Sequence, residues 1–153
     1  MQVSSELQSQ LFNKWLIADL LYKNDRLTWT KNHSRHELII IPWATGLWVK
    51  QAGLVSYHAL AEALRYEAEA KAYNLSVRTY HAGYLVSSQQ EANKNYFVDC
   101  VKGKWQCNCM RYRCWKNRMH KELPQLYKAL DNKIFCHHIV AAYNYTKQLK
   151  TKN

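Results

Sequence analysis

The chain of 153 residues contains only four glycines and two prolines. This scarcity excludes collagen-like and low-complexity architectures, which need far more of both residues. No apolar run is long enough to cross a bilayer, because the most apolar stretch, 38–49, is short and contains Pro42 and Gly46. The first ten residues also lack the basic and apolar regions of a secretory signal. We therefore expect an intracellular protein, cytoplasmic or nuclear, with no membrane contact.

Common catalytic motifs are absent as well. The sequence has no Gly-x4-Gly-Lys-Ser/Thr loop, no paired carboxylates in its basic region and no Gly-x-Ser-x-Gly elbow. Cys114 has arginine neighbours that would favour a thiolate, but no base partner for nucleophilic catalysis is evident. We therefore expect a protein that is not an enzyme.

Hydrophobic residues make up 48% of the sequence, which gives a chain of this length enough apolar material to bury a core. Apolar residues at helical spacing and runs of β-branched and aromatic residues occur in separate segments, which predicts an α+β fold. Residues 76–86 and 96–101 are expected to pair as antiparallel strands, and Lys102-Gly103 to form a tight turn after them. The expected helices are 5–23, 56–73, 125–130 and 138–149, and the expected strands are 37–41, 47–50, 76–86, 96–101 and 104–107.

The formal net charge of +11 is concentrated in the last third of the chain. Residues 1–99 hold ten Lys and Arg against nine Asp and Glu, whereas residues 100–153 hold twelve against two. All five cysteines also lie in this last third. A positive field of this size predicts a polyanionic partner, and the specialised chemistry is expected after residue 99.

Two short motifs in the basic region have the spacing of metal ligands. Cys107 and Cys109 are separated by one residue at the end of an expected hairpin, and Cys136 and His138 are separated by one residue at the start of an expected helix. Three cysteines and one histidine complete the tetrahedral shell of zinc and leave no open position. This spacing predicts one structural Zn2+ bound by Cys107, Cys109, Cys136 and His138.

Two other assignments of the cysteines remain open at this stage. Cys107, Cys109, Cys114 and His120 form a more compact set that could also enclose zinc. Alternatively, the cysteines are plain buried thiols, since free cysteine is often a small buried hydrophobe. If instead Cys107, Cys109, Cys136 and His138 are the ligands, Cys100 and Cys114 do not bind the metal, and His137 is expected beside the ligand shell or at the surface.

The two motifs in their context resemble the SWIM-type zinc finger. An aromatic strand with Tyr96 and Phe97 precedes the first pair, and an apolar helix beginning at Ile139 follows the second pair. The resemblance covers about residues 95–145, with a long spacer of 26 residues between Cys109 and Cys136, and does not extend to residues 1–94. It implies that the four residues named above bind zinc, and that the finger binds DNA or another protein.

The spacer between the two ligand pairs alternates basic and aromatic residues. Basic groups attract phosphates and aromatic rings stack on bases, so this pattern is typical of nucleic-acid contact. The alternative is a solvated basic helix whose Trp115 and Met119 pack in the core. The expected nucleic-acid contacts are Arg111, Arg113, Lys116, Arg118, Lys121, Lys104, Tyr112 and Trp115.

These observations predict a zinc-binding module or accessory subunit that binds nucleic acid, with DNA favoured over RNA. Residues 1–94 are expected to form an α/β scaffold region packed with the SWIM-like zinc-finger region 95–153 in one compact unit. The alternative function is a protein-interaction adaptor, in which the zinc only stabilises the fold and the apolar N-terminal helix or the aromatic-rich surface binds a larger enzyme. An acidic protein is the alternative partner to nucleic acid.

Overall fold

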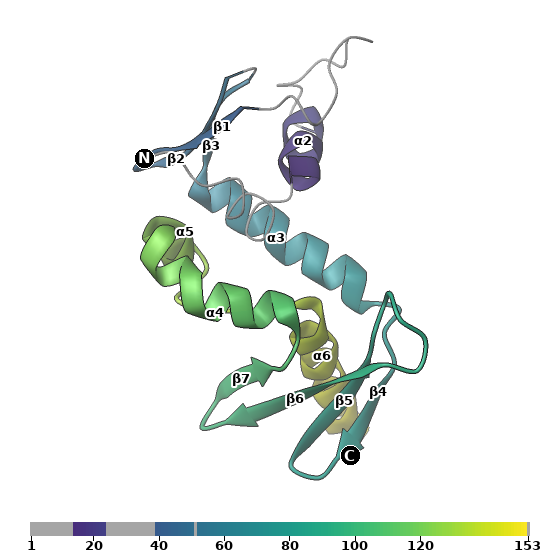
Figure 1. The fold of residues 1–153 in the computed structure, drawn as a ribbon. Coiled ribbons are helices and arrows are strands. Elements are labelled where there is room, and N and C mark those ends of the chain that lie inside the picture. The colour runs from purple at the N-terminus through teal and green to yellow at the C-terminus, as the bar shows by residue number, and fades with distance from the viewer. Residues whose placement is uncertain (1–13, 24–38, 51, 153) are drawn as a thin grey trace. The chain divides into compact units, whose positions relative to one another are not determined.

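The computed structural model describes residues 14–23, 39–50 and 52–152, and its mixture of helices and antiparallel sheets confirms the predicted α+β class (Figure 1). The chain forms two units, the first from residues 1–64 and 117–133 and the second from residues 65–116 and 134–153. Residues 94 and 95, at which the sequence prediction divides scaffold from finger, both lie in the second unit. That the whole chain forms one compact unit stays a prediction.

The first unit contains a three-stranded antiparallel sheet in the order β1-β2-β3. The strands are β1 (Ile40–Pro42), β2 (Gly46–Val49) and β3 (Gly53–Ser56). The first two agree with the predicted strands, although β1 ends at Pro42, one residue beyond the predicted end of the strand at residue 41. The sequence analysis did not predict β3, because the two apolar residues after Gly53, Leu54 and Val55, give too short a pattern to separate from the start of the following helix.

Helices supply the rest of the first unit. Helix α2 (Lys14–Lys23) buries Ile17, Ala18 and Leu21, so the described part of the predicted helix 5–23 is helical and its apolar side is buried; residues 5–13 lie outside the described residues. Helix α3 (Tyr57–Ala72) agrees with the predicted helix 56–73; its residues up to Leu64 belong to this unit and the rest belong to the second unit. Helix α5 (Pro124–Ala129) begins at its proline, where a missing N–H costs nothing.

The second unit is built on a four-stranded antiparallel sheet in the order β4-β5-β6-β7. The strands are β4 (Val77–Tyr80), β5 (Gly83–Ser87), β6 (Asn95–Val101) and β7 (Lys104–Cys107). Lys102 and Gly103 connect β6 to β7 with φ values of 50° and 76°, and positive φ at both turn residues is what a type I′ hairpin requires. The predicted tight turn is therefore confirmed.

One sequence prediction needs correction in this sheet. The segment 76–86 is not one strand but the hairpin β4–β5, and its chain reverses at His81, which has a φ of 50°. The turn carries neither the Asn-Gly nor the Asp-Gly pair that usually marks a two-residue hairpin, so the β-branched run on either side conceals it.

Helix α6 (His137–Thr151) packs against one face of this sheet and agrees with the predicted helix 138–149. Strand side chains alternate between the two faces, so Val86 and Val98 point to the side that also meets Ile139 and Ala142 of α6. Helix α4 (Met110–Glu122) follows β7 directly. The end of β7 and the starts of α4 and α6 thus place the predicted ligands next to this core. Among the residues that the structure describes, no helix is both long and apolar enough to cross a membrane.

Candidate metal centre

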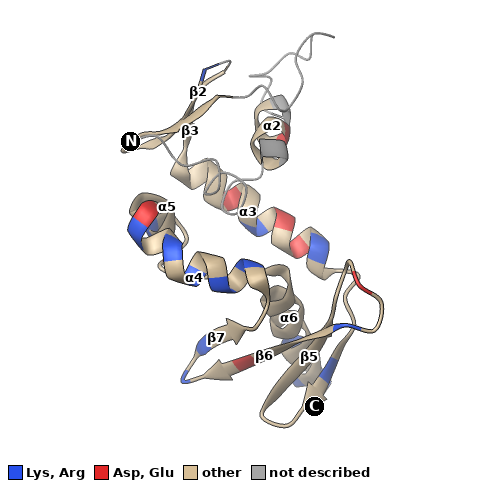
Figure 2. Ribbon diagram, in the orientation of Figure 1, with Lys and Arg blue, Asp and Glu red and all other residues tan. Residues whose placement is uncertain are grey.

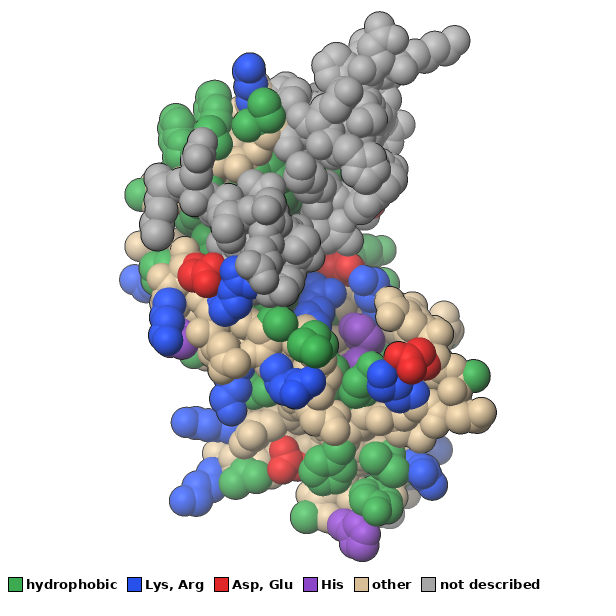
Figure 3. Space-filling model, in the orientation of Figure 1, with side chains coloured by type: hydrophobic (Ala, Val, Ile, Leu, Met, Phe, Trp, Pro, Cys, Tyr) green, Lys and Arg blue, Asp and Glu red, His purple; other side chains and the backbone are tan. Residues whose placement is uncertain are grey.

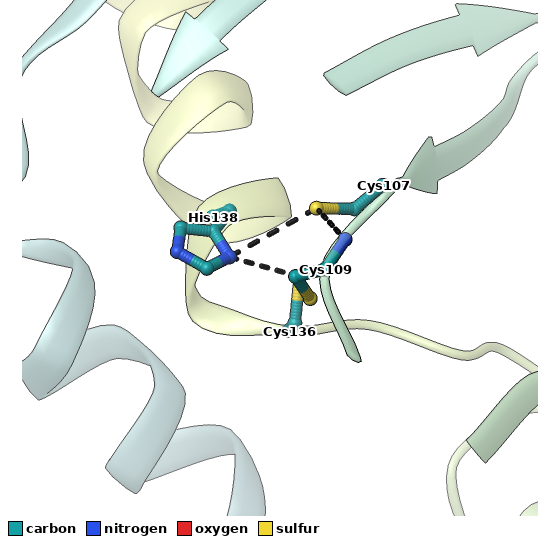
Figure 4. A group of neighbouring side chains, drawn as sticks. All are labelled: Cys107, Cys109, Cys136 and His138. Atoms are coloured by element: carbon teal, nitrogen blue, oxygen red, sulfur yellow. Dashed lines mark hydrogen bonds between the residues drawn. The ribbon is translucent and has the colours of Figure 1, made fainter. Parts of the chain in front are cut away.

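Three elements of the second unit bring four ligand side chains together (Figure 4). Cys107 is the last residue of β7, Cys109 directly precedes α4, Cys136 directly precedes α6, and His138 is the second residue of α6. All four side chains are buried, and their ligand atoms lie within 4.8 Å of one another. This is the ligand set that the spacing of the two motifs predicts.

Asn108 fixes the chain reversal between the first two cysteines. Its backbone N–H donates to the carbonyl oxygen of Phe97 over 3.2 Å, and its side-chain Oδ1 accepts from the backbone N–H of Phe97 over 3.0 Å. The chain is therefore tied to β6 at the point where β7 ends. Immediately afterwards, the backbone N–H of Cys109 donates to the Sγ atom of Cys107 over 3.4 Å. Such hydrogen bonds favour the thiolate over the thiol.

Two of the cysteines stand at the N-termini of helices. The carbonyl oxygen of Cys109 accepts from Arg113 N–H over 3.1 Å, so Cys109 occupies the N-cap of α4. Cys136 is the N-cap of α6, with extended backbone and with its carbonyl oxygen accepting from Val140 N–H over 3.1 Å. The N-terminus of a helix carries partial positive charge. Both helices therefore stabilise negative charge on these sulfur atoms.

His138 presents Nδ1 to the cysteines. This nitrogen lies 3.9 Å from Cys107 Sγ and 3.8 Å from Cys136 Sγ (Figure 4). The ring packs beside Tyr96 of β6, with 4.3 Å between ring centroids, which helps to hold its orientation. Its other nitrogen, Nε2, is buried and has no hydrogen-bond partner among the described residues. A metal bound by Nδ1 would require the imidazole tautomer that carries its proton on Nε2.

The spacing of these atoms fits a single metal ion. Zinc bonds of about 2.3 Å to sulfur and about 2.0 to 2.1 Å to nitrogen, at tetrahedral angles, place the ligand atoms roughly 3.5 to 3.8 Å apart. The distances of 3.8 and 3.9 Å from His138 Nδ1 are close to that range. Four soft and borderline donors around one point can thus hold a metal ion in a closed shell.

The pKa values of the three thiols depend on one another, and they indicate what a bound cation would contribute. Hydrogen bonds from Cys107 and Cys136 lower the pKa of Cys109 below its ordinary value. The pKa of Cys107 is raised to about 12, because its thiol donates to Cys109, and that of Cys136 is also raised, because its thiol donates to both neighbours and is buried. Ionising all three would crowd three negative charges together, which a divalent cation at their centre would neutralise in large part.

The remaining cysteines and histidines of this region lie outside the cluster. Cys100 is exposed on β6, Cys114 is half-buried on α4 and His120 is exposed. The more compact assignment with Cys114 and His120 is therefore not the set that the structure brings together. His137 packs its ring 4.1 Å from that of His138, and burial lowers its pKa to about 4. It lies beside the ligand shell, as predicted, without contributing a ligand.

The aromatic residues Tyr112 and Trp115 of α4 are buried, so the prediction that they stack on bases needs correction. Trp115 is 1% exposed and Tyr112 is 7% exposed. The Tyr112 hydroxyl donates to the carbonyl oxygen of Trp105 over 3.3 Å, and the Trp115 ring meets the Phe135 ring edge to face. Both side chains are core residues, as in the alternative considered for Trp115 and Met119, so neither ring has a free face for a base.

Two of the predicted basic contacts have structural partners. The Arg111 guanidinium lies 4.6 Å from the centre of the Trp115 ring and 3.4 Å from Glu67 Oε2. Arg118 donates two hydrogen bonds to the carboxylate of Glu122, over 2.9 and 3.2 Å. These arginines contribute positive charge, but each guanidinium already has an acidic partner.

Four other predicted basic residues are exposed and make no ion pair with any residue that the structure describes. Figure 2 shows Lys and Arg positions along α4 and at the β6–β7 hairpin. These side chains can reach phosphate groups without giving up an internal ion pair. They are Lys104 on β7 and Arg113, Lys116 and Lys121 on α4.

Sequence reasoning missed two residues that shape this region. Asn108 was not singled out, although a short amide between two cysteines at a strand end is a recognisable signal for a side chain that bonds to the backbone. Glu67 also went unnoticed as a partner of Arg111, because 44 residues separate them and no local pattern connects them.

No protein-family model, no curated protein and no solved structure matches the chain. The chemistry of the described residues therefore carries the functional inference.

Proposed function

We propose that the cluster of Cys107, Cys109, Cys136 and His138 is a structural zinc site of the SWIM type and that the chain is a nucleic-acid-binding module or accessory subunit. The observation that carries the metal assignment is the convergence of four buried ligand atoms within 4.8 Å. Three thiolates and one imidazole suit zinc better than magnesium or calcium, which prefer oxygen ligands. The order of the ligands in the sequence resembles that of the SWIM-type finger.

The zinc has a structural role in this proposal. Four protein ligands leave no position open for water or substrate, so the ion does not activate a nucleophile. Instead it joins the end of β7, the start of α4 and the start of α6. The protein is accordingly proposed to be a binding module and not an enzyme.

The charge of the second unit supports a polyanionic partner. This unit holds twelve Lys and Arg against four Asp and Glu, a formal net charge of +8. Three bound thiolates and one Zn2+ would lower this value by about one charge. Two of the four acids are already paired, Glu67 with Lys71 and Arg111 and Glu91 with Lys94. The field outside the unit is therefore strongly positive, and nucleic-acid phosphates are the complementary partner.

Metal content tests the zinc assignment. Purified protein should contain one zinc ion per chain, and Cys136→Ser should lose it. Cys114→Ser is the matched control, because Cys114 lies outside the cluster, and should keep the ion. Loss of zinc from Cys114→Ser with retention in Cys136→Ser would overturn the ligand set.

The salt dependence of binding tests the nucleic-acid function. Affinity for DNA and for RNA should appear at low salt and fall steeply as salt rises, because binding to phosphates releases counterions. Replacing both Arg113 and Lys116 by alanine should reduce the log–log slope by about 0.7 to 0.9 for each phosphate that the variant no longer neutralises. Negligible affinity for every nucleic acid at low salt would exclude this function and leave the adaptor with an acidic protein partner.

A further inference from the structure

The face of the four-stranded sheet turned away from α6 carries exposed aromatic and basic side chains. Strand alternation and the pairing register place one row of this face at Arg78, Leu85 and Phe97, and the next row at Tyr80, Gly83, Asp99 and Gln106. Tyr80 is 46% exposed, and Leu85 and Phe97 are half-buried. In Figure 3 hydrophobic side chains gather over the lower sheet, with Lys and Arg toward its margins.

The aromatic rings on this outer face are held in place by their surroundings. A Cβ atom at Gly83 would lie 2.7 Å from the Phe97 ring, so the ring covers the backbone of β5 at the one position without a side chain. The Tyr80 ring meets the Phe97 ring edge to face, with 6.4 Å between centroids and 79° between planes. This pair is therefore ordered before any ligand binds, which lowers the entropic cost of binding.

We propose that this outer face is the site where the unpaired bases of single-stranded nucleic acid stack, with Tyr80 and Phe97 as the stacking residues. The inference rests on the proposed nucleic-acid function and specifies the form of nucleic acid that is bound. The rings of Tyr112 and Trp115 are buried in the core, so the aromatic surface that accompanies the basic residues is on the sheet and not on α4.

The distribution of charge on this face fits a single strand. Arg78 on β4 and Lys104 on β7 are exposed on the two edge strands, and Lys102 is exposed in the β6–β7 turn. None of the three makes an ion pair with a described residue. Asp99 lies between these edges, which keeps phosphates away from the centre of the face. Phosphates therefore follow the basic margins while bases lie over the aromatic centre.

The polar groups at the centre can bond to base edges. Asp99 and Gln106 pair across β6 and β7 and are both half-buried on this face. A carboxylate accepts hydrogen bonds from exocyclic amino groups, and a carboxamide both donates and accepts. These edge contacts do not by themselves require an unpaired base, but stacking on the rings of Tyr80 and Phe97 does, because a duplex keeps its bases stacked on each other. The occupant is therefore a single strand.

Three ligands separate stacking from phosphate attraction: a short oligothymidylate, an abasic oligonucleotide with the same number of phosphates, and a blunt-ended duplex without unpaired bases. The zinc-loaded chain should bind oligothymidylate more tightly than either of the other two. Tyr80→Ala should weaken oligothymidylate binding by about 5- to 150-fold, the usual contribution of one stacked base, and leave the affinity for the abasic strand unchanged. Repeating the comparison with oligouridylate tests RNA.

Two further variants keep the experiment interpretable. Phe97→Leu preserves an apolar group over Gly83 while removing the ring, and should weaken oligothymidylate binding over the same range. Tyr143→Ala is the matched control, because Tyr143 is 43% exposed on α6, on the opposite side of the sheet. It should leave the affinity unchanged. Retained zinc content verifies that each variant is folded.

The outcomes distinguish this inference from the function on which it rests. Equal affinity for oligothymidylate, the abasic strand and the duplex would overturn base stacking but leave phosphate binding intact. Equal losses in Tyr80→Ala and Tyr143→Ala would overturn the assignment to this face. Absence of binding to all three ligands at low salt would overturn both proposals. Equally tight binding of poly-glutamate would overturn the nucleic-acid occupant in favour of an acidic protein.

Discussion

The backbone N–H of Tyr112 donates a hydrogen bond to the Sγ atom of Cys109 over 3.4 Å. Tyr112 is the third residue of α4, and a side chain that accepts from this N–H is the N-cap of the helix. Cys109 is therefore both a candidate metal ligand and the residue that caps α4. These two roles can be separated by substitution.

Replacing Cys109 by serine or by alanine should have the same effect on metal binding and different effects on the helix. Both variants should lose the metal, because neither side chain supplies a thiolate. Serine still caps α4, so in the presence of a chelator Cys109→Ser should be more stable than Cys109→Ala by about 1 kcal/mol. Metal analysis and urea unfolding measure the two effects. Equal stabilities of the metal-free variants would contradict the capping role.

Removing the metal should loosen the elements that the cluster joins. Amide hydrogen exchange should accelerate at Cys109, Tyr112 and Val140, whose N–H groups bond to cluster residues. The N–H groups of Tyr127 and Leu130 bond within the first unit and provide the control. Exchange measured by mass spectrometry with and without a zinc chelator tests this. Acceleration of the same size at all five positions would mean that the metal does not act locally.

Glu67 should stabilise the protein through its bonds to Lys71 and Arg111. Burial acts to raise the pKa of Glu67, but the hydrogen bond from Lys71 and the charge of Arg111 outweigh it, so the net shift is downward. Glu67→Gln should therefore lower the free energy of unfolding at pH 7, by about 1 kcal/mol because water still screens this group.

The sign of the pKa shift fixes the pH dependence of this effect. A lowered folded pKa gives stability that is full above the ordinary value of 4.5 and is lost as the pH falls through the folded value. The difference between wild type and Glu67→Gln should therefore shrink in acid. Exposed Glu69 makes no ion pair with a described residue and is the matched control, so Glu69→Gln should change the free energy of unfolding at pH 7 less than Glu67→Gln does. Urea unfolding at a series of pH values checks both variants.

Gly83 should tolerate alanine poorly. A Cβ atom there would lie 2.5 Å from the Val98 carbonyl oxygen as well as 2.7 Å from the Phe97 ring. Gly83→Ala should therefore destabilise the sheet by roughly 2 to 4 kcal/mol. Gly103 has a φ of 76° and open space around it, so Gly103→Ala should cost only about 1 kcal/mol of backbone strain. Thermal unfolding compares the two, and a larger loss at Gly103 would contradict this packing.

The sequence predicted the elements with strong local signals. Periodic apolar residues identified α3 and α6, and the Lys102-Gly103 pair identified the turn between β6 and β7. The two ligand pairs were recognisable because zinc ligation needs particular residue types at short spacing. These features depend on chemistry within a few neighbouring residues, which a single sequence displays directly.

Features that depend on tertiary neighbours were not predictable in the same way. Helical spacing shows that Tyr112 and Trp115 share α4 with several arginines, but their burial depends on tertiary neighbours such as Trp105 and Phe135. The reversal at His81 was concealed because a residue other than glycine or asparagine adopts positive φ there. The packing around these residues outweighs their local preferences.

The segment between the two ligand pairs, 110–135, is divided between the two units of the chain. Residues 110–116 and 134–135 belong to the same unit as the ligands, whereas residues 117–133 belong to the other unit. The chain therefore leaves the unit of the ligands after residue 116 and returns to it at residue 134, and the ligand pairs lie on either side of this excursion. Loop closure becomes only slowly more costly with length, by about 0.6 kcal/mol per doubling. Lengthening the excursion therefore costs little entropy, but residues 117–133 cannot be exchanged freely, because Met119, Leu123, Leu126 and Leu130 are buried core residues. An insertion in this segment has to preserve these four side chains.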